Sequence, residues 1–349
     1  MNINAKELYE SRKMHLTLFG LGIAFVAAIC NVVFQNFNVA ASSVIESGFP
    51  TSLVAAYVLS VLILGTCELT GGILMILFNT VFKGIPLAEY GRVWGVKSAR
   101  TILLSSILAS PIATAAAVMS IAMCGSTYSN CIIGLTPVVA SILGIIILKE
   151  KVGIRSWVGI IICVIGALIA TLAPPEGITN FYLGIAIACV CPLMYALENI
   201  ISVHAVDTVD PMIACPVFRM IGSGIMAIII AAIVAVVTGH AEWVGLAFSL
   251  MTSSKTCVVL MFCAALFMAI QYNGTYNSYT VLGAAKGAAI LWTGTFWTVP
   301  VGFAMMAMNI LDYSVSGLGI VGAVAVVIGI CLIVAKPSEL LNLRANEND

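Results

Sequence analysis

Two glutamates, Glu68 and Glu198, interrupt long apolar stretches of a chain in which only 9% of the residues are charged. An ionisable side chain in a hydrocarbon layer is costly, and one that is kept there usually pairs or serves a function. Glu68 lies in the segment TCELTGG, and Gly65 and Gly72 fall on the same helical face. The sequence therefore predicts either a proton- or cation-binding carboxylate at Glu68 or a paired glutamate within a tight helix contact.

Arg219 is a possible partner for the second carboxylate, because Arg219 and Glu198 flank one short polar turn. In a helical hairpin both side chains would lie at a similar depth, which predicts a structural ion pair. The alternative is that Glu198 faces a cavity beside Tyr195 and Asn199 and takes part in proton coupling.

Amide and aromatic side chains in the apolar stretches can also recognise a solute, since they form hydrogen bonds and offer ring faces to a cation. The candidate lining residues of a substrate cavity are Gln35, Asn36, Glu68, Tyr195, Glu198, Asn199, Gln271, Asn273, Asn277 and Trp292. The alternative for aromatic residues is anchoring at the membrane interface, which is favoured for Tyr276 and Tyr279. Lys286 is expected either to reach the cytoplasmic interface or to attract an anionic group.

Prolines fall inside the same apolar stretches, at Pro111, Pro137, Pro192, Pro216 and Pro300. Each removes a helical hydrogen bond and is expected to kink its helix. Such kinks act either as gates or as fixed bends, and the sequence favours neither reading.

The elements that carry these residues are expected to be membrane-spanning helices. Apolar residues make up 61% of the 349, whereas a soluble domain is roughly a quarter charged and at most half apolar. A span needs about 20 mostly apolar residues, and ten such segments fit the length. The predicted spans are 15–40, 51–78, 98–123, 127–148, 154–173, 180–204, 212–238, 257–278, 282–310 and 315–335.

Lysine and arginine give the expected orientation, because cytoplasmic loops are enriched in these residues. Ten spans place 14 of the 15 basic residues on the side that holds both termini, and only Lys255 on the other side. The sequence therefore predicts cytoplasmic termini in a cell membrane of the bacterial inner-membrane type. The zero net charge argues against a nucleic-acid partner.

The chain repeats itself at a shift of 163 residues. The shift superimposes Pro137 on Pro300, Gly159 on Gly322, Gly166 on Gly329, Pro174 on Pro337, and Gln35-Asn36 on Glu198-Asn199. Each half would contain five spans, and an odd number places equivalent positions on opposite faces of the membrane. Inverted repeats of this kind are common in transporters, with a substrate site near the midplane between the halves.

The segment TYSNCIIGLTPVVASILGIIILKEKVGIRSWVGIIICVIGALIA carries the most specific pattern. It resembles the EamA-like branch of the drug/metabolite transporter superfamily, which has a proline midway along span four, a closing glutamate, and two spaced glycines in span five. Pro137, Glu150, Gly159 and Gly166 fit that order, while Tyr313 stands where the second half would have its closing glutamate. The resemblance implies inner-membrane metabolite transport, frequently export.

These observations predict an all-α integral membrane protein of ten transmembrane helices, built as two inverted five-helix repeats. The expected parts are a cytoplasmic segment 1–14, a first repeat 15–174, a second repeat 178–337 and a cytoplasmic tail 338–349. The expected partners are a small-molecule solute and the lipid bilayer, and the sequence leaves monomer and homodimer open. We expect no metal and no cofactor, since the cysteines lack ligand spacing.

The expected function is secondary transport of an amino acid or a related zwitterion or amine by alternating access, with proton-coupled export as one mode. A non-transporting membrane sensor or scaffold is one alternative. An integral-membrane lipid-modifying enzyme is another, but His15, His204 and His240 fall on different membrane sides and cannot easily form one site. We therefore do not expect an enzyme.

Overall fold

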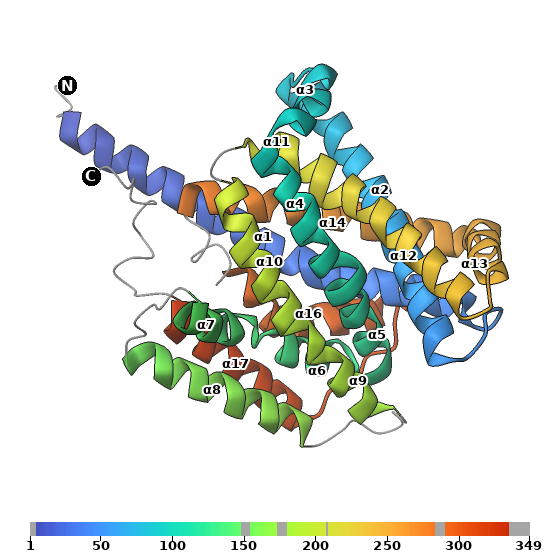
Figure 1. Ribbon diagram of the computed structural model, residues 1–349. Coiled ribbons are helices and arrows are strands. Elements are labelled where there is room, and N and C mark those ends of the chain that lie inside the picture. The colour runs from blue at the N-terminus through green and yellow to red at the C-terminus, as the bar shows by residue number, and fades with distance from the viewer. Residues whose placement is uncertain (1–4, 148–153, 173–179, 207–208, 283–289, 335–349) are drawn as a thin grey trace.

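The computed structural model describes residues 5–147, 154–172, 180–206, 209–282 and 290–334, and the elements in these ranges are helices. They pack into one bundle, in which long helices cross at various angles (Figure 1). The predicted all-α class is confirmed for these residues.

The described helices of the first half follow the predicted order, with short extra turns. They are α1 (Ala5–Glu46), α2 (Leu53–Lys83), α3 (Leu87–Arg92), η1 (Val93–Gly95), α4 (Lys97–Ile107), η2 (Leu108–Thr114), α5 (Ala115–Cys124), α6 (Ser126–Ile133), α7 (Thr136–Ile147) and α8 (Ile154–Thr171). Those of the second half are α9 (Phe181–Ala188), α10 (Val190–Val206), α11 (Pro211–Ala214), η3 (Cys215–Gly222), α12 (Ser223–Val237), α13 (Glu242–Ser253), α14 (Lys255–Leu282), α16 (Gly294–Ala307) and α17 (Gly317–Val334).

Nine helical stretches in the described ranges are long and apolar enough to cross a membrane, and Gly317–Ile333 is a shorter apolar helix. The nine are Met14–Glu46, Leu53–Lys83, Ala99–Cys124, Ser126–Leu143, Ile154–Thr171, Phe181–Glu198, Pro211–Val237, Lys255–Leu282 and Ile290–Ala307. These helices fit a multi-pass membrane protein, which agrees with the predicted all-α membrane class.

The proline positions coincide with irregular helix in four of five places. Pro111 and Pro216 lie inside the wide turns η2 and η3. The breaks before α7 and α10 come just upstream of Pro137 and Pro192, where the proline ring crowds the carbonyl four residues back. Around Pro300 the helix α16 is continuous.

The chain reverses between α5 and α6 at Gly125, whose φ of 89° is in the region that favours glycine. The sequence predicted a boundary at this point, between the third and fourth spans. It did not predict α13, because the segment EWVGLAFSLMTS was read as part of a loop.

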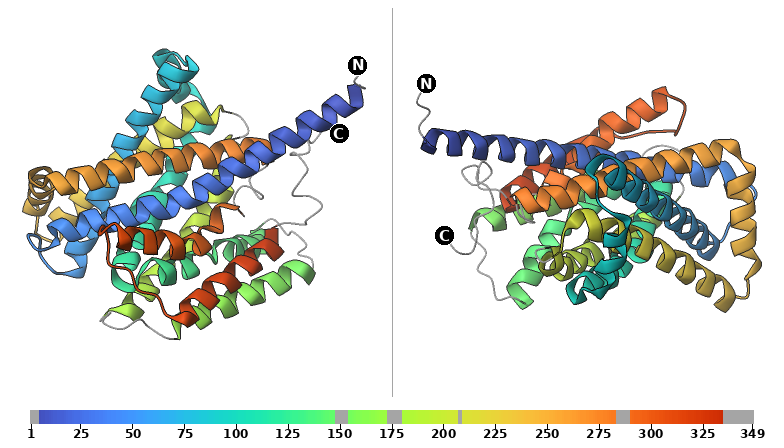
Figure 2. Two further views of the ribbon diagram at one scale, coloured as in Figure 1. Left: turned by 180° about the vertical axis from the view of Figure 1, so that it is seen from behind. Right: turned by 90° about the horizontal axis from the view of Figure 1, so that it is seen from above.

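Paired glycines bring α8 and α17 into close contact along their length, at one edge of the bundle (Figures 1 and 2). A methyl group at Gly159 would lie 2.7 Å from the carbonyl oxygen of Gly329, and one at Gly166 would lie 3.0 Å from that of Gly322. Residue numbers rise along α8 as they fall along α17, which means that the two helices run antiparallel. Small residues allow this approach, since no side chain separates the backbones.

Helices α1 and α14 run side by side through the middle of the bundle (Figure 2). Here Gly274 faces Ala27 and Ile23 on α1, and a methyl group at Gly274 would meet the Ala27 Cβ at 3.1 Å. These two long helices connect the region around α2 and α13 to the opposite end of the bundle.

Candidate functional site

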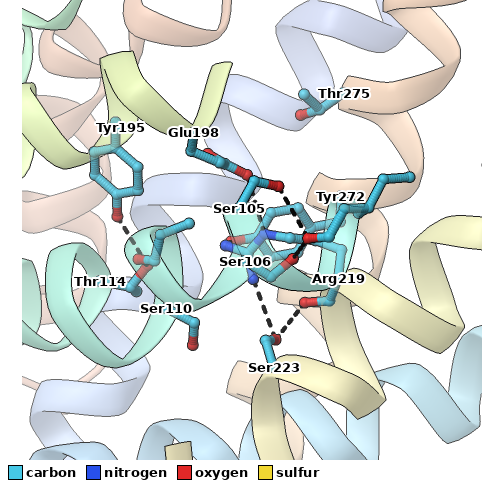
Figure 3. A network of polar contacts seen from close by, with 12 residues as sticks. Ser105, Ser106, Ser110, Thr114, Tyr195, Glu198, Arg219, Ser223, Tyr272 and Thr275 are labelled. Carbon is cyan, nitrogen blue, oxygen red and sulfur yellow. Dashed lines mark hydrogen bonds and ion pairs between the residues drawn. The ribbon is translucent and has the colours of Figure 1, made fainter. Parts of the chain in front are cut away.

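Charged and hydroxyl side chains from six segments meet inside the bundle. Figure 3 shows most of this group, with Arg219 at its centre. We call it the central ion cluster and define it as Glu68 (α2), Ser110 (η2), Glu198 (α10), Arg219 (η3), Ser223 (α12) and Tyr272 (α14).

Glu68 is a fully satisfied carboxylate. Its Oε1 accepts a hydrogen bond from Arg219 Nη1 at 3.0 Å. Its Oε2 accepts from Ser110 Oγ at 2.6 Å and from Ser223 Oγ at 2.9 Å. The side chain is completely buried, at 0% exposure, so these partners offset the loss of water that would otherwise make a buried carboxylate costly.

Arg219 is shared between both glutamates and one aromatic ring. Its Nη2 donates to the Tyr272 hydroxyl, and its Cζ lies 4.2 Å from the Tyr272 ring centroid. Its Nε lies 3.4 Å from Glu198 Oε1, yet no described residue accepts a hydrogen bond from Nε. The Glu198 side of Arg219 is therefore held less tightly than the Glu68 side.

Glu198 differs from Glu68 in both burial and bonding. Its side chain keeps 13% exposure, and the ion pair with Arg219 Nε is the contact that holds it in the described part of the chain. Among the described residues, Glu198 has fewer donors to its carboxylate than Glu68.

The charges of the cluster do not balance. Two carboxylates face one guanidinium, which leaves one negative charge in excess when all three groups are ionised. An uncompensated charge inside a protein is unfavourable unless it is paired. The arrangement can therefore take up a proton or a cation at the carboxylate that is held less tightly.

The local sequence explains how the helices carrying Glu68 and Arg219 approach so closely. A methyl group at Gly65 would lie 2.9 Å from the Gly224 carbonyl oxygen, and one at Gly72 would lie 3.1 Å from that of Pro216. Both glycines flank Glu68, so α2 contacts η3 and α12 backbone to backbone. This is the close contact that the spacing of Gly65 and Gly72 predicted.

Tyr195 and Trp292, two predicted cavity residues, meet on the other side of η2. Their ring centroids lie 5.4 Å apart, and the Tyr195 hydroxyl pairs with Thr114 Oγ1 at 2.9 Å. Figure 3 shows Tyr195 and Thr114 beside the central ion cluster. These residues belong to one neighbourhood, although neither aromatic ring bonds a glutamate.

Gln35 and Asn36 lie on α1 and have different surroundings. Gln35 Oε1 accepts a hydrogen bond from Asn130 Nδ2 at 3.2 Å. Asn36 is fully buried at 0% exposure, and neither atom of its amide has a hydrogen-bond partner among the described residues. An unpaired buried amide is costly, so Asn36 is a site where a solute or water molecule would gain hydrogen bonds.

Three of the remaining predicted residues lie on α14. Gln271 donates to Thr275 at 3.2 Å, and Asn277 donates to Asn273 Oδ1 at 2.7 Å, so these pairs bond along α14 itself. Lys286 and the side chain of Asn199 lie outside the described residues.

Sequence reasoning missed the two serines of the cluster, namely Ser110 and Ser223. The serines are common in membrane helices and carry no charge to mark them. One signal was present, because Arg219 and Ser223 are four residues apart and thus share a helix face. Nothing local connected Ser110 or Tyr272 to either glutamate.

Comparisons with known proteins give no family for this chain. No model of a known protein family matches it, and no curated protein matches it. One solved structure, described only as "Crystal structure of protein", covers 87% of this chain and 97% of its own length, with 11% sequence identity and a TM-score of 0.44. At this level the similarity indicates neither family nor function.

Proposed function

We propose that this chain is a secondary transporter that moves an amino acid, or a related zwitterion or amine, across the cytoplasmic membrane by alternating access. The observation that carries the proposal is the central ion cluster, in which Arg219 is shared by Glu68 and Glu198 inside the helical bundle. Ionisable groups kept within a membrane mark substrate and ion pathways.

Reciprocal contacts support the two inverted repeats that this mechanism requires. Gly159 and Gly166 correspond to Gly322 and Gly329 at the shift of 163 residues. Gly159 packs against Gly329, while Gly166 packs against Gly322. This exchange of partners is what a two-fold axis produces, and antiparallel helices place that axis in the membrane plane.

A residue on such an axis contacts the residue that corresponds to it in the other half, 163 positions along the chain. Cys163 makes a contact of this kind. Its Sγ donates to the carbonyl oxygen of Val326 at 3.3 Å, and Val326 is 163 residues further along the chain. The contact lies midway between the two glycine pairs along α8. The packing of α8 on α17 therefore supports the proposed repeat.

Ten spans complete this proposal. The nine long apolar helices need the shorter helix Gly317–Ile333 as a tenth to return the C-terminus to the side of the N-terminus. The strong asymmetry of lysine and arginine then favours cytoplasmic termini in a cell membrane. This arrangement is that of the EamA-like transporters, which the sequence of the fourth and fifth spans resembles.

The cluster lies where the proposed halves meet. Glu68 and Ser110 come from the first half, while Glu198, Arg219, Ser223 and Tyr272 come from the second. A relative movement of the halves must therefore change the contacts of Arg219. We assign Glu198 the role of coupling carboxylate, because the described residues hold it through one ion pair, and Glu68 the role of holding Arg219 in place.

The alternatives make different demands on the protein. A sensor or scaffold needs a partner surface but no solute flux, and a lipid-modifying enzyme needs convergent catalytic groups at an interface. The cluster favours transport over both, since its excess charge is enclosed among helices and Glu198 is only 13% exposed.

Solute exchange by the purified protein in proteoliposomes tests the proposal. Vesicles loaded with the unlabelled protein amino acids and their decarboxylated amines are expected to accumulate labelled members of the same set by counterflow. Protein-free vesicles and vesicles with heat-inactivated protein serve as controls. If the folded protein exchanges no member faster than these controls, transport of this solute class is refuted and the sensor or scaffold gains support.

A further inference from the structure

Basic and large apolar side chains are exposed together at one corner of the bundle, where α2 ends and the chain turns through α3 and η1 into α4. Figure 1 shows this corner at the top, with α3 at its tip. We call residues 81–100 the α3 corner. It is separate from the central ion cluster, none of whose members lies in this range.

The charge of the α3 corner is mostly positive. Lys83, Arg92, Lys97 and Arg100 are exposed, and Glu89 is the acidic residue of this range. Glu89 Oε1 pairs with Arg92 Nη1 at 2.6 Å. No described residue forms an ion pair with Lys83, Lys97 or Arg100. Four basic residues minus one acidic residue leave a net charge of +3, which an anionic partner would neutralise.

A neighbouring acid reduces this excess without removing it. Asp210 is the N-cap of α11, which packs beside α3, and its Oδ1 accepts a hydrogen bond from Met212 N at 2.9 Å. With Asp210 counted, the excess is still +2. Lys97 and Arg100 also lie in the first turn of α4, where the helix dipole adds partial positive charge.

Large apolar side chains of the same corner are exposed beside these charges. Phe82 is 74% exposed, Leu87 is 64% exposed and Trp94 is 48% exposed. The Trp94 ring packs against Phe218 on η3, with ring centroids 4.7 Å apart, which holds the ring in place while much of it stays exposed. Aromatic rings beside basic residues are typical of the membrane interface, where the rings lie at headgroup level and the charges meet anionic lipids.

The length of α2 is consistent with this depth. The helix contains 31 residues and is therefore about 46 Å long, whereas the hydrocarbon layer is about 30 Å thick. A tilt of about 40° would still leave α2 longer than this layer. Its end at Lys83 therefore reaches the headgroup layer. Tyr90 and Val93 fix the following turn to the bundle, because they are buried in a cluster with Phe218.

We propose that the α3 corner binds an anionic phospholipid, in the leaflet that is cytoplasmic in the proposed topology. The three basic residues without an ion pair attract the headgroup phosphate, while Phe82, Leu87 and Trp94 contact the glycerol and the upper acyl chains. A free phosphate ion or an acidic protein would match the charge but would leave these apolar side chains in water. The inference requires that the helices cross a bilayer, and it does not depend on transport.

Quenching of Trp94 fluorescence tests the lipid selectivity. Full-length protein is placed in nanodiscs that contain phosphatidylcholine and phosphatidylglycerol with the same acyl chains. One of the two lipids is brominated on these chains, and bromine quenches nearby tryptophans. The Trp94 signal is the difference from the Trp94→Phe variant, since Trp157, Trp243, Trp292 and Trp297 also fluoresce.

We expect the quenching to show that phosphatidylglycerol is preferred over phosphatidylcholine at Trp94 by at least about tenfold, since each basic residue near an anionic lipid contributes about fivefold. The triple variant Lys83→Gln, Lys97→Gln and Arg100→Gln should lose this preference. The matched variant Lys83→Arg, Lys97→Arg and Arg100→Lys keeps the three charges and should retain it. Lys255→Gln, which removes an exposed charge at the start of α14, should leave it unchanged.

Glu89→Gln gives a change in the opposite direction. It releases Arg92 from its ion pair, and it should raise the preference for phosphatidylglycerol about fivefold. This variant decides the question if the triple glutamine variant does not fold.

Three results would overturn the proposal. The first is equal quenching by the two brominated lipids, and the second is a preference that persists in the folded triple glutamine variant or does not rise with Glu89→Gln. The third is complete relief of the quenching by millimolar inorganic phosphate, because the site would then take a free anion in place of a lipid. Transport can fail or succeed in proteoliposomes without changing any of these outcomes.

Discussion

Arg219→Met is expected to destabilise the folded protein by about 3–5 kcal/mol, because it leaves a buried carboxylate without its charge partner. Glu68 is the group affected most, since it is fully buried and accepts from Arg219 Nη1 at 3.0 Å. Methionine preserves much of the side-chain length, so packing changes least. The measurement is thermal unfolding of purified protein in detergent.

A second substitution separates charge from packing. The double variant Arg219→Met with Glu68→Gln should recover a large part of the lost stability, because the glutamine keeps its bonds to Ser110 and Ser223 without a buried charge. Lys255→Met, at the exposed start of α14, is the control and should unfold like the unchanged protein. A double variant less stable than Arg219→Met alone would contradict the proposed pairing.

Glu198→Gln is expected to abolish the pH dependence of solute flux and to leave the protein folded. Glu198 is the carboxylate with residual exposure, and Arg219 Nε at 3.4 Å is its ion-pair partner. Glutamine retains the shape of the side chain but neither gains nor loses a proton. The measurement is exchange in proteoliposomes under an imposed pH gradient, with and without the substitution.

Glu68→Gln provides the matched comparison, since both variants remove one carboxylate from the same cluster. It should reduce stability and change flux at every pH alike, because Glu68 holds Arg219 and does not exchange the proton. If Glu198→Gln keeps the pH dependence and Glu68→Gln loses it, the coupling role belongs to Glu68.

The sequence predicted the framework of the fold because that framework follows from apolar length and charge asymmetry. Most of the described helices fall within or around the predicted spans. The helix α1 begins at Ala5, however, so it includes much of the segment 1–14 that was predicted to be a separate cytoplasmic segment. That segment is polar and contains good helix formers, so the helix extends past the apolar stretch. The helix α13 was missed, since twelve residues are too few to mark a span.

The contacts of the central ion cluster could be predicted only between residues that are close in the sequence. Glu198 and Arg219 flank one turn, and a hairpin brings them to a common depth. Glu68 and Arg219 are 151 residues apart, and their contact depends on how α2 packs against η3. No pattern in one sequence specifies that packing, although Gly65 and Gly72 indicated which face of α2 would make a close contact.

The proposed division of roles between the glutamates rests on structural contacts and not on the sequence. The sequence offered both as proton-coupling groups, since each interrupts an apolar stretch. Hydrogen bonds from Ser110, Ser223 and Arg219 distinguish Glu68 from its neighbour. Ser110 and Ser223 contact Glu68 only in the folded structure. Their distance from Glu68 along the sequence therefore does not predict these hydrogen bonds.

The central claim is that two equivalent halves cross the membrane in opposite directions around the shared arginine. Lys151 and Ser314 are 163 residues apart and therefore correspond to each other at the shift of the proposed repeat. Single Lys151→Cys and Ser314→Cys variants, with Cys189 and Cys331 replaced by serine, can be treated with an impermeant maleimide in vesicles of known orientation. Inverted halves predict that the thiol at position 151 reacts only from the cytoplasmic face and the thiol at 314 only from the opposite face; reaction of both from one face would contradict the claim.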